Sequence, residues 1–289
     1  MSDTRDFFIT GPAGRLSLRS KGLAARPAQV VILVQGANMS GQMGYDFAFE
    51  GAASDAGYSM MDALVAAGFG ALTFSVRGYA LSDKPADGFS VQTDAAIEDL
   101  DTVVDWVRAQ GWARPHLLGW SWGGRITGRY VEGHADRVDR LVLMDPALGG
   151  GQKILPVPTD PWWTNSYAYF IDRLEPEFSE DAAREALARR MDSEELKAPN
   201  GIRMENALGT KRVEPDRVTR PTLMIYGSAA AQQNYMQGGW NRLDFYDKLA
   251  TQDKAYVLIP GCGDYAHLQK PRQRIWQACI DFLRHPSAG

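Results

Sequence analysis

The chain has few of the residues that build disulfide scaffolds, metal centres or nucleic-acid surfaces. Its 289 residues include only two cysteines, Cys262 and Cys279, and four histidines. Two thiols cannot make a disulfide framework or a four-cysteine zinc site, although one isolated disulfide stays open. With 31 Lys and Arg against 35 Asp and Glu, the net charge is −4. This negative net charge leaves no basic surface for a nucleic-acid backbone, so we predict no nucleic-acid partner. Because the chain has so few cysteines, we also predict no metal site.

Long hydrophobic runs are also missing. No stretch approaches the ~18 apolar residues of a membrane-spanning helix. The opening residues, MSDTRDFF, carry acids and lead into no signal-peptide core. We therefore expect a soluble, cytoplasmic protein without a membrane partner.

What is present is an ordinary globular composition, with 45% hydrophobic and 23% charged residues. Short apolar runs typical of strands buried on both faces recur along the chain. They span residues 29–34, 70–76, 116–118, 141–144, 222–226 and 256–259. Helical patterns at 58–67, 93–109 and 122–132 separate the first four runs. This alternation predicts an α/β fold with a mostly parallel sheet, and the runs at 7–10 and 16–20 predict an antiparallel hairpin at its edge.

The alternation stops after Pro146. Residues 147–220 contain no strand-like run, but they include the aromatic stretch PWWTNSYAYF at 161–170 and a charged helical pattern near 179–197. This pattern is typical of a helical cap inserted into a sheet domain. We predict a core domain of residues 1–146 and 221–289 and a helical cap, or lid, at 147–220.

A G-x-S-x-G motif follows the third of the central strand-like runs and precedes a helical pattern. The residues are Gly119, Trp120, Ser121, Trp122 and Gly123. The glycines permit a sharp turn from strand to helix, which exposes the serine oxygen above the sheet at a helix N-terminus. The motif therefore predicts Ser121 as a nucleophile.

With these features the sequence resembles the α/β-hydrolase superfamily over nearly its whole length. The loop Gln35-Gly36-Ala37-Asn38 follows the first central strand, where the family usually has His-Gly. The segment RGYALSDKP at 77–85 is similar to the family's Arg-Gly-x-Gly-x-Ser, with alanine in place of one glycine. The resemblance implies an α/β-hydrolase fold, no metal or organic cofactor, a small-molecule substrate, and an oxyanion hole formed by the amides of Ala37 and Trp122. It leaves a homodimer open.

The last loop departs from the family pattern at the base. The family places its histidine directly after the glycine, and Asp264 occupies that position in the segment CGDYAHLQKP at 262–271. His267 is the remaining candidate, because His116 lies in a strand, His134 follows the elbow helix and His285 is near the end of the chain. A modest shift of the loop would point His267 at Ser121.

The acid of a Ser-His-Asp triad is displaced as well. The family usually has an aspartate at the position of Ala230. Some relatives take the acid from the end of the preceding strand, which is Asp145, and Asp264 is the alternative. Asp145 precedes a proline, which is also a common turn pairing.

Aromatic side chains indicate an apolar pocket near Ser121. We predict that Gln35, Asn38, Trp120, Trp162, Trp163 and Tyr167 contact substrate. The aromatic residues of the cap are also explained by simple packing. The long loop 39–59 carries Asp46, Glu50 and Asp55, which either bind a polar group or are merely solvated.

These features predict a serine hydrolase of carboxylic esters or lactones with an apolar or aromatic part. Ser121 would attack the carbonyl, His267 would relay the proton, and water would release the acyl group. Cleavage of an amide is a related possibility. Two alternatives belong to other classes: a ligand-binding protein with an impaired triad, or a lyase or C–C bond reaction in which Asp264 is the acid or base.

Overall fold

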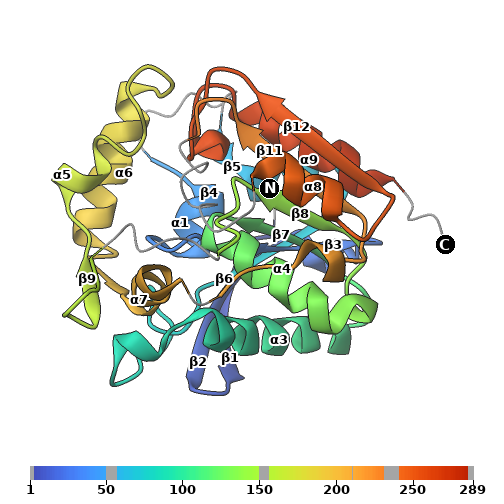
Figure 1. The fold of residues 1–289 in the computed structure, drawn as a ribbon, viewed down its shortest axis with the longest axis horizontal. Helices are drawn as coiled ribbons and strands as arrows, with labels where there is room; N and C mark the ends of the chain where they lie inside the picture. Colours follow the sequence, from blue (N-terminus) through green and yellow to red (C-terminus); the bar gives the residue numbers. More distant parts are fainter. Residues whose placement is uncertain (1–2, 50–56, 150–155, 210, 231–240, 286–289) are drawn as a thin grey trace.

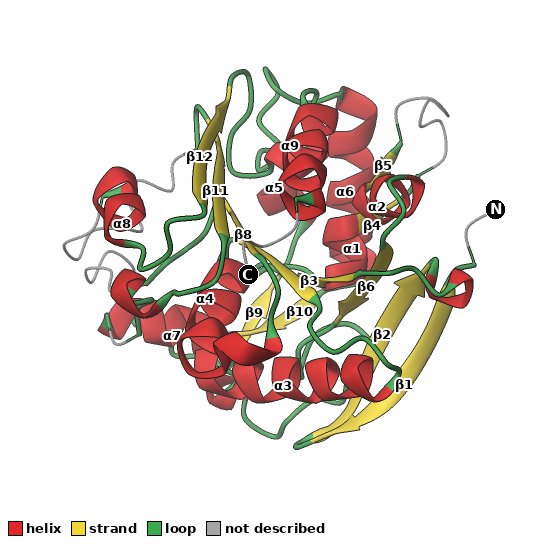
Figure 2. Ribbon diagram, turned by 90° about the vertical axis from the view of Figure 1, so that its right-hand side faces the viewer, coloured by secondary structure: helices red, strands yellow, loops and turns green. Residues whose placement is uncertain are grey.

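The computed structural model describes residues 3–49, 57–149, 156–209, 211–230 and 241–285. A sheet of eight strands forms the centre (Figure 1). In spatial order the strands are β1 (Arg5–Gly11), β2 (Gly14–Lys21), β6 (Gly70–Phe74), β3 (Val30–Val34), β7 (His116–Trp120), β8 (Leu141–Met144), β11 (Thr222–Gly227) and β12 (Lys254–Ile259). The strands from β6 to β12 are parallel, and β1 and β2 form an antiparallel hairpin at one edge (Figure 2).

Helices cover both faces of this sheet. They are α1 (Gly41–Tyr45), α2 (Met60–Ala66), α3 (Thr93–Ala109), α4 (Trp122–His134), α8 (Arg242–Lys248) and α9 (Arg272–Arg284). Successive side chains of β3 alternate between the faces, so Ile32 packs in one core cluster and Leu33 in the other. The first cluster holds the apolar faces of α3 and α4, and the second holds those of α2 and α9. The predicted α/β-hydrolase fold with its mostly parallel sheet is therefore confirmed.

The segment 147–220, which we call the cap segment, lies to one side of the sheet (Figure 1). It contains β9 (Trp162–Thr164), α5 (Tyr167–Phe170), α6 (Asp181–Ser193), β10 (Lys197–Pro199) and α7 (Gly201–Leu208). The prediction that it holds no strand was wrong, because β9 and β10 pair antiparallel. Three residues are too few to show a sequence period. The division of the chain into a core domain and a cap domain stays a prediction.

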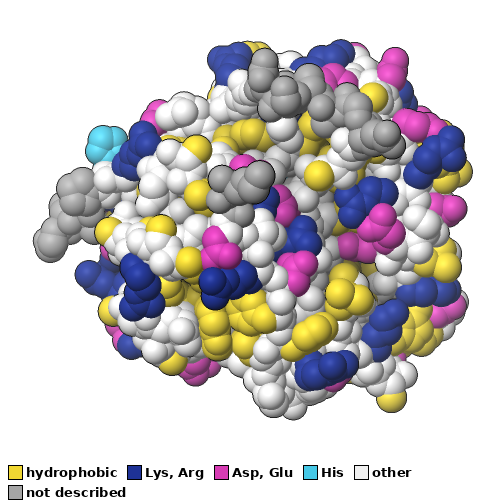
Figure 3. Space-filling view, turned by 180° about the vertical axis from the view of Figure 1, so that it is seen from behind, with side chains coloured by type: hydrophobic (Ala, Val, Ile, Leu, Met, Phe, Trp, Pro, Cys, Tyr) yellow, Lys and Arg dark blue, Asp and Glu magenta, His cyan; other side chains and the backbone are white. Residues whose placement is uncertain are grey.

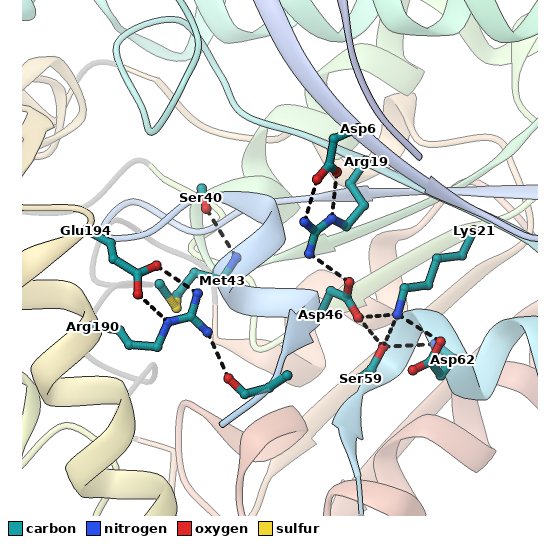
Figure 4. Close-up of polar contacts among 11 residues, drawn as sticks. Asp6, Arg19, Lys21, Ser40, Met43, Asp46, Ser59, Asp62, Arg190 and Glu194 are labelled. Carbon is teal, nitrogen blue, oxygen red and sulfur yellow. Dashed lines mark hydrogen bonds and ion pairs between the residues drawn. The ribbon is translucent and has the colours of Figure 1, made fainter. Parts of the chain in front are cut away.

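The loop after β3 is pinned by ion pairs rather than left in solvent. Within it, β4 (Asp46–Phe47) pairs with β5 (Tyr58–Ser59). The Asp46 carboxylate accepts from Lys21 Nζ at 2.6 Å and from Arg19 Nη1 at 3.0 Å, as Figure 4 shows. Asp46 therefore serves the packing of this loop against β2. The other two acids that we noted here, Glu50 and Asp55, lie outside the described residues.

The remaining structural findings bear on partners and metals. Both cysteines are buried free thiols, which closes the disulfide alternative. Within the described ranges, no helix is long and apolar enough to cross a membrane, and no group of three or more His, Cys, Asp or Glu side chains is placed to hold a metal ion. On the face seen in Figure 3, basic and acidic side chains intermingle, and hydrophobic side chains gather toward its lower part.

The buried position of Lys21 generates a prediction about stability. Its side chain is 8% exposed and that of Asp46 is 7% exposed, so removing the ammonium leaves a buried carboxylate with Arg19 as its remaining cation. We expect Lys21→Met to lower the free energy of unfolding by about 2 kcal/mol in urea denaturation. The matched control is Arg5→Met, whose pair with Asp3 is exposed and is worth less than about 0.5 kcal/mol. Equal effects of the two substitutions would contradict this account.

Candidate active site

The site is built around the turn between β7 and α4. Ser121 occupies this turn with φ 53° and ψ −117°, a conformation that L residues rarely adopt. Three hydrogen bonds hold it: its N–H donates to the Met144 carbonyl at 3.1 Å, and its carbonyl accepts from Ala147 at 2.8 Å and Gly124 at 3.0 Å. Such a backbone costs on the order of 1–3 kcal/mol and persists only where the surroundings enforce it.

The glycines of the motif permit close approach between backbones. A Cβ at Gly119 would lie 2.2 Å from the carbonyl oxygen of Gly123. A Cβ at Gly123 would lie 2.1 Å from the carbonyl oxygen of Val34 in β3. Both distances are too short for any side chain, so α4 can begin this close to β3 and β7 only with glycine at these positions.

Ser121 opens into a cavity of about 710 Å³. One wall comes from the loop after β3 and the turn before α4, and it includes Ala37, Asn38 and Trp122. The last loop contributes Asp264 and Tyr265. The cap segment supplies most of the other lining residues. Its aromatic residues there are Trp162, Trp163 and Tyr169, and its arginines are Arg173 and Arg203. The cap segment also contributes Pro156, Val157, Pro158, Thr159, Asp160, Thr164, Asn200, Ile202 and Asn206.

Two backbone amides beside Ser121 are available to a ligand. Trp122 is the first residue of α4, where an N–H has no partner within the helix. Neither its N–H nor that of Ala37 donates a hydrogen bond to any group in the described ranges. Both residues line the cavity. Two unpaired donors at this position can bind a negatively charged oxygen.

The loop after β3 and the cap segment are joined at Asn38. Its Nδ2 donates to the Tyr169 hydroxyl at 3.1 Å, and its Oδ1 accepts from Arg203 Nη2 at 2.6 Å. Its carbonyl accepts from Asn165 Nδ2 at 3.0 Å. Two residues further on, Ser40 N donates to the buried carboxylate of Glu195 at 2.7 Å. The cap segment therefore holds the loop that carries the amide of Ala37.

Two carboxyl groups lie close together at the carboxyl ends of the strands. The last loop presents Asp264 to the cavity, held by a hydrogen bond from Trp120 Nε1 to the Asp264 carbonyl at 2.8 Å. Asp145 is fully buried after β8, and its Oδ1 accepts from Gly227 N at 3.1 Å. Burial, followed by the negative charge of Asp264, raises the pKa of Asp145 well above its ordinary value.

The structure places His267 outside the lining of the cavity that Ser121 shares. The imidazole is fully buried, 4.6 Å from the Trp120 ring and 5.6 Å from the Tyr45 ring between centroids. It does not line the cavity, and neither ring nitrogen makes a hydrogen bond within the described ranges. Burial lowers the pKa of His267 to about 3. The last loop turns the side chain of His267 against the Trp120 ring and not into the cavity.

The other histidines lie away from the cavity too. His116 is buried within β7, with its Nδ1 3.6 Å from an oxygen of Asp139. His134 stacks on Tyr130 at the end of α4, and His285 is exposed after α9. No histidine of the described ranges lines the cavity with Ser121.

Six of the predicted oxyanion-hole and substrate-binding residues line the cavity: Ala37, Asn38, Trp120, Trp122, Trp162 and Trp163. Two do not. Gln35 is buried and its Oε1 accepts from Val76 N at 3.0 Å, which ties two strand ends together. Tyr167 donates instead to Glu185 of α6 at 2.5 Å.

Sequence analysis missed Arg173 and Arg203, which line the cavity. Arginine is abundant in the chain, and nothing in the local sequence around these two residues distinguishes them from surface arginines. Only the folding of the cap segment over the turn at Ser121 brings them to the cavity.

Comparison with known proteins agrees with this fold. The family described as alpha/beta hydrolase fold matches residues 29–235. Among curated proteins, a 2-hydroxy-6-oxononadienedioate/2-hydroxy-6-oxononatrienedioate hydrolase of Escherichia coli O139:H28 is 33% identical over 100 residues, or 35% of this chain. The match spans about a third (33%) of that relative's length.

Two solved structures resemble the whole chain. The enol-lactonase from Burkholderia xenovorans LB400 superposes with a TM-score of 0.71 and 17% identity, over 96% of this chain and 100% of the other. An esterase from Exiguobacterium antarcticum gives a TM-score of 0.69 and 18% identity, over 97% of this chain and 100% of the other. At such low identity these likenesses show the fold alone.

The glycine contacts of α4 generate a prediction with an internal control. Gly123→Ala would force its methyl group against the Val34 carbonyl oxygen, so we expect a loss of about 3 kcal/mol in the free energy of unfolding. In the same helix, a Cβ at Gly133 would meet no atom within 4 Å. Gly133→Ala should therefore stabilise the protein by about 0.5 kcal/mol. Thermal or urea denaturation compares the two, and a mild effect at Gly123 would contradict the geometry.

The burial of His267 generates a prediction about pH. In the unfolded chain its pKa is near 6.5, about the ordinary value, whereas in the folded protein the pKa is about 3. The unfolded state binds more protons between these values, so this contribution to stability is complete above pH 6.5 and is lost progressively as the pH falls toward 3. Between pH 6.5 and 5 the loss is about 2 kcal/mol. We expect His267→Phe to flatten the pH profile of unfolding by that amount.

The control for the pH profile is His285→Phe at an exposed position. It should leave the slope of the unfolding free energy against pH unchanged. An unchanged slope in His267→Phe as well would show that the imidazole is not enclosed.

Proposed function

The chain belongs to the alpha/beta hydrolase fold family, and on that premise we propose that it is a serine hydrolase of carboxylic esters or lactones with an apolar or aromatic part. The observation that carries the proposal is the turn at Ser121. The serine stands in a strained backbone at the head of α4, opening into a cavity that the unpaired amides of Ala37 and Trp122 share. This arrangement suits attack of a hydroxyl on a carbonyl carbon.

The two amides form the oxyanion hole of the proposed reaction. As Ser121 Oγ bonds to the carbonyl carbon, the carbonyl oxygen gains negative charge that the two N–H groups bind. Each such donor contributes about 3 kcal/mol in enzymes where it has been removed. The positive end of the α4 dipole adds to the same effect.

Asp264 is the proposed base. It lines the cavity with Ser121, and it occupies the position at which the family has histidine. Burial and the nearby charge of Asp264 both disfavour ionisation of Asp145, so we assign the proton transfer to Asp264. The carboxylate accepts the proton of Ser121 and then donates it to the departing alcohol. Water, deprotonated by the same carboxylate, releases the acyl group and restores the serine.

The walls of the cavity support the substrate class. Trp120, Trp162 and Trp163 present aromatic surface to it, which suits an apolar or aromatic part better than a sugar. The enol-lactonase and the esterase that share the fold act, by their names, on bonds of this kind.

A second candidate is cleavage of a C–C bond next to a carbonyl group, with Asp264 as the acid or base. One observation favours it: the matched Escherichia coli hydrolases act, by their names, on hydroxy-oxo dioates, which carry a ketone. The match covers about a third of those proteins (33%), so the ester or lactone hydrolase remains the main proposal.

Labelling with a fluorophosphonate tests the nucleophile and the base together. We expect one adduct per chain, mapped to Ser121 by peptide mass, and none in Ser121→Ala. Asp264→Asn should slow labelling roughly 100-fold, the usual contribution of a general base. His267→Phe should label within twofold of the unmodified protein, because His267 does not line the cavity.

The outcomes separate the hypotheses. Absence of an adduct at Ser121 would overturn the serine-hydrolase proposal and favour ligand binding or the C–C reaction. Slow labelling in His267→Phe, with the fold intact by circular dichroism, would return the role of base to the histidine. A large gain of esterase rate in Asp264→His would indicate an impaired triad, whereas a loss would show that the aspartate is part of a working site.

A further inference from the structure

The cavity contains an arginine, Arg203, that forms no ion pair with a carboxylate of the described residues. Arg203 lies on α7 and lines the cavity. Two of its hydrogen bonds go to neutral amides: Nη2 donates to Asn38 Oδ1 at 2.6 Å and Nη1 donates to Asn200 Oδ1 at 3.2 Å. The Tyr169 hydroxyl, also neutral, is a further hydrogen-bond partner. Within the described ranges it forms no ion pair. A guanidinium in that setting keeps its charge but loses much of its hydration.

Stacking fixes the orientation of this guanidinium. Its central carbon lies 4.1 Å from the centre of the Trp163 ring. The Trp163 ring meets the Tyr169 ring edge to face at 5.3 Å, and Arg173 stacks on Tyr169 at 4.4 Å. The four side chains thus form one contiguous row in which the two rings lie between the two cations. A stacked and hydrogen-bonded guanidinium binds an oxyanion with little loss of side-chain entropy.

Charged side chains of both signs line the cavity. Asp264 lies in the last loop beside the turn at Ser121, whereas Arg173 and Arg203 belong to the cap segment. Asp160 is the other lining carboxylate; it is exposed, and its Oδ1 accepts from Trp162 N at 2.8 Å. Burial lowers the pKa of Arg203, and the nearby hydroxyls of Tyr79 and Tyr169 oppose this effect.

We propose that Arg203 binds a carboxylate of the substrate, so that the substrate is an ester or lactone whose apolar or aromatic part ends in a carboxylate. The substrate carboxylate would supply the countercharge that Arg203 lacks among the described residues. Repulsion from Asp264 and attraction to Arg203 would orient the molecule with its carbonyl group at Ser121. This inference rests on the proposed hydrolase function, because only a hydrolase makes the bound molecule a substrate. Binding of a carboxylate at Arg203 does not itself depend on catalysis.

The test is therefore made first on binding. In the Ser121→Ala protein, isothermal titration calorimetry compares 4-phenylbutyrate with 4-phenylbutyramide, which match in shape and differ in charge. We expect the carboxylate to bind at least tenfold more tightly than the amide. Arg203→Gln should reduce this preference to less than threefold, and Arg203→Lys should retain an intermediate preference because it keeps the charge but not the planar group.

The matched control is Arg26→Gln. Arg26 also stacks on a tryptophan, with its central carbon 4.7 Å from the Trp112 ring, but it does not line the cavity. It should leave the preference for the carboxylate unchanged. Equal binding of the two ligands to the parent protein, or an equal weakening of both in a folded Arg203→Gln protein, would overturn the proposal. The second outcome would show that Arg203 only supports Asn38 and the loop after β3.

A kinetic measurement separates this inference from the proposed function. The 4-nitrophenyl monoester of glutarate carries a free carboxylate, and 4-nitrophenyl valerate does not. We expect the ratio of their kcat/KM values to fall at least tenfold in Arg203→Gln. Failure of both esters to react, with the carboxylate preference intact in calorimetry, would overturn the hydrolase and leave the anion site standing. Turnover of both esters with an unchanged ratio in Arg203→Gln would overturn the anion site and leave the hydrolase standing.

Discussion

The strained backbone of Ser121 is the constraint on which the rest of the structure depends. The turn has to reverse direction between β7 and α4 within one residue, and it does so only because neighbouring backbones can approach without side chains at Gly119 and Gly123. Hydrogen bonds to Met144 and Ala147 hold the residue there. The result is a serine that lies at the surface of a cavity and at the N-terminal end of a helix, and the N–H of its neighbour Trp122 has no partner among the described residues.

The loop after β3 completes the site, and the cap segment fixes that loop. The amide of Ala37 belongs to a connection with little regular structure. Hydrogen bonds from Arg203 and Asn165 to Asn38, together with the Ser40 to Glu195 contact, hold this connection from the other side of the cavity. The elements that shape the cavity wall and those that position the second amide are therefore the same elements.

The cavity brings acidic and basic side chains together. Asp264 of the last loop lines it, and burial together with the charge of Asp264 raises the pKa of the neighbouring Asp145. The cap segment brings two arginines to the cavity. These charged groups share the cavity with the aromatic side chains of Trp120, Trp162 and Trp163.

The sequence by itself determined the sheet, the helices that separate its strands and the turn at Ser121. Their signals are local: apolar runs of one strand length, a helical period at 93–109, and glycines on either side of a serine. The residues named from position along the chain, such as Ala37, Trp122 and Trp163, reached the cavity because the fold fixes where each loop ends.

Only the tertiary structure decided which charged and titratable groups meet. His267 and Asp264 are three residues apart, and the direction of one loop places the carboxylate in the cavity and the imidazole behind Trp120. Arg203 and Asn38 are 165 residues apart and share a hydrogen bond. Such contacts depend on the packing of segments that are distant in the sequence, so no local pattern of residues can indicate them.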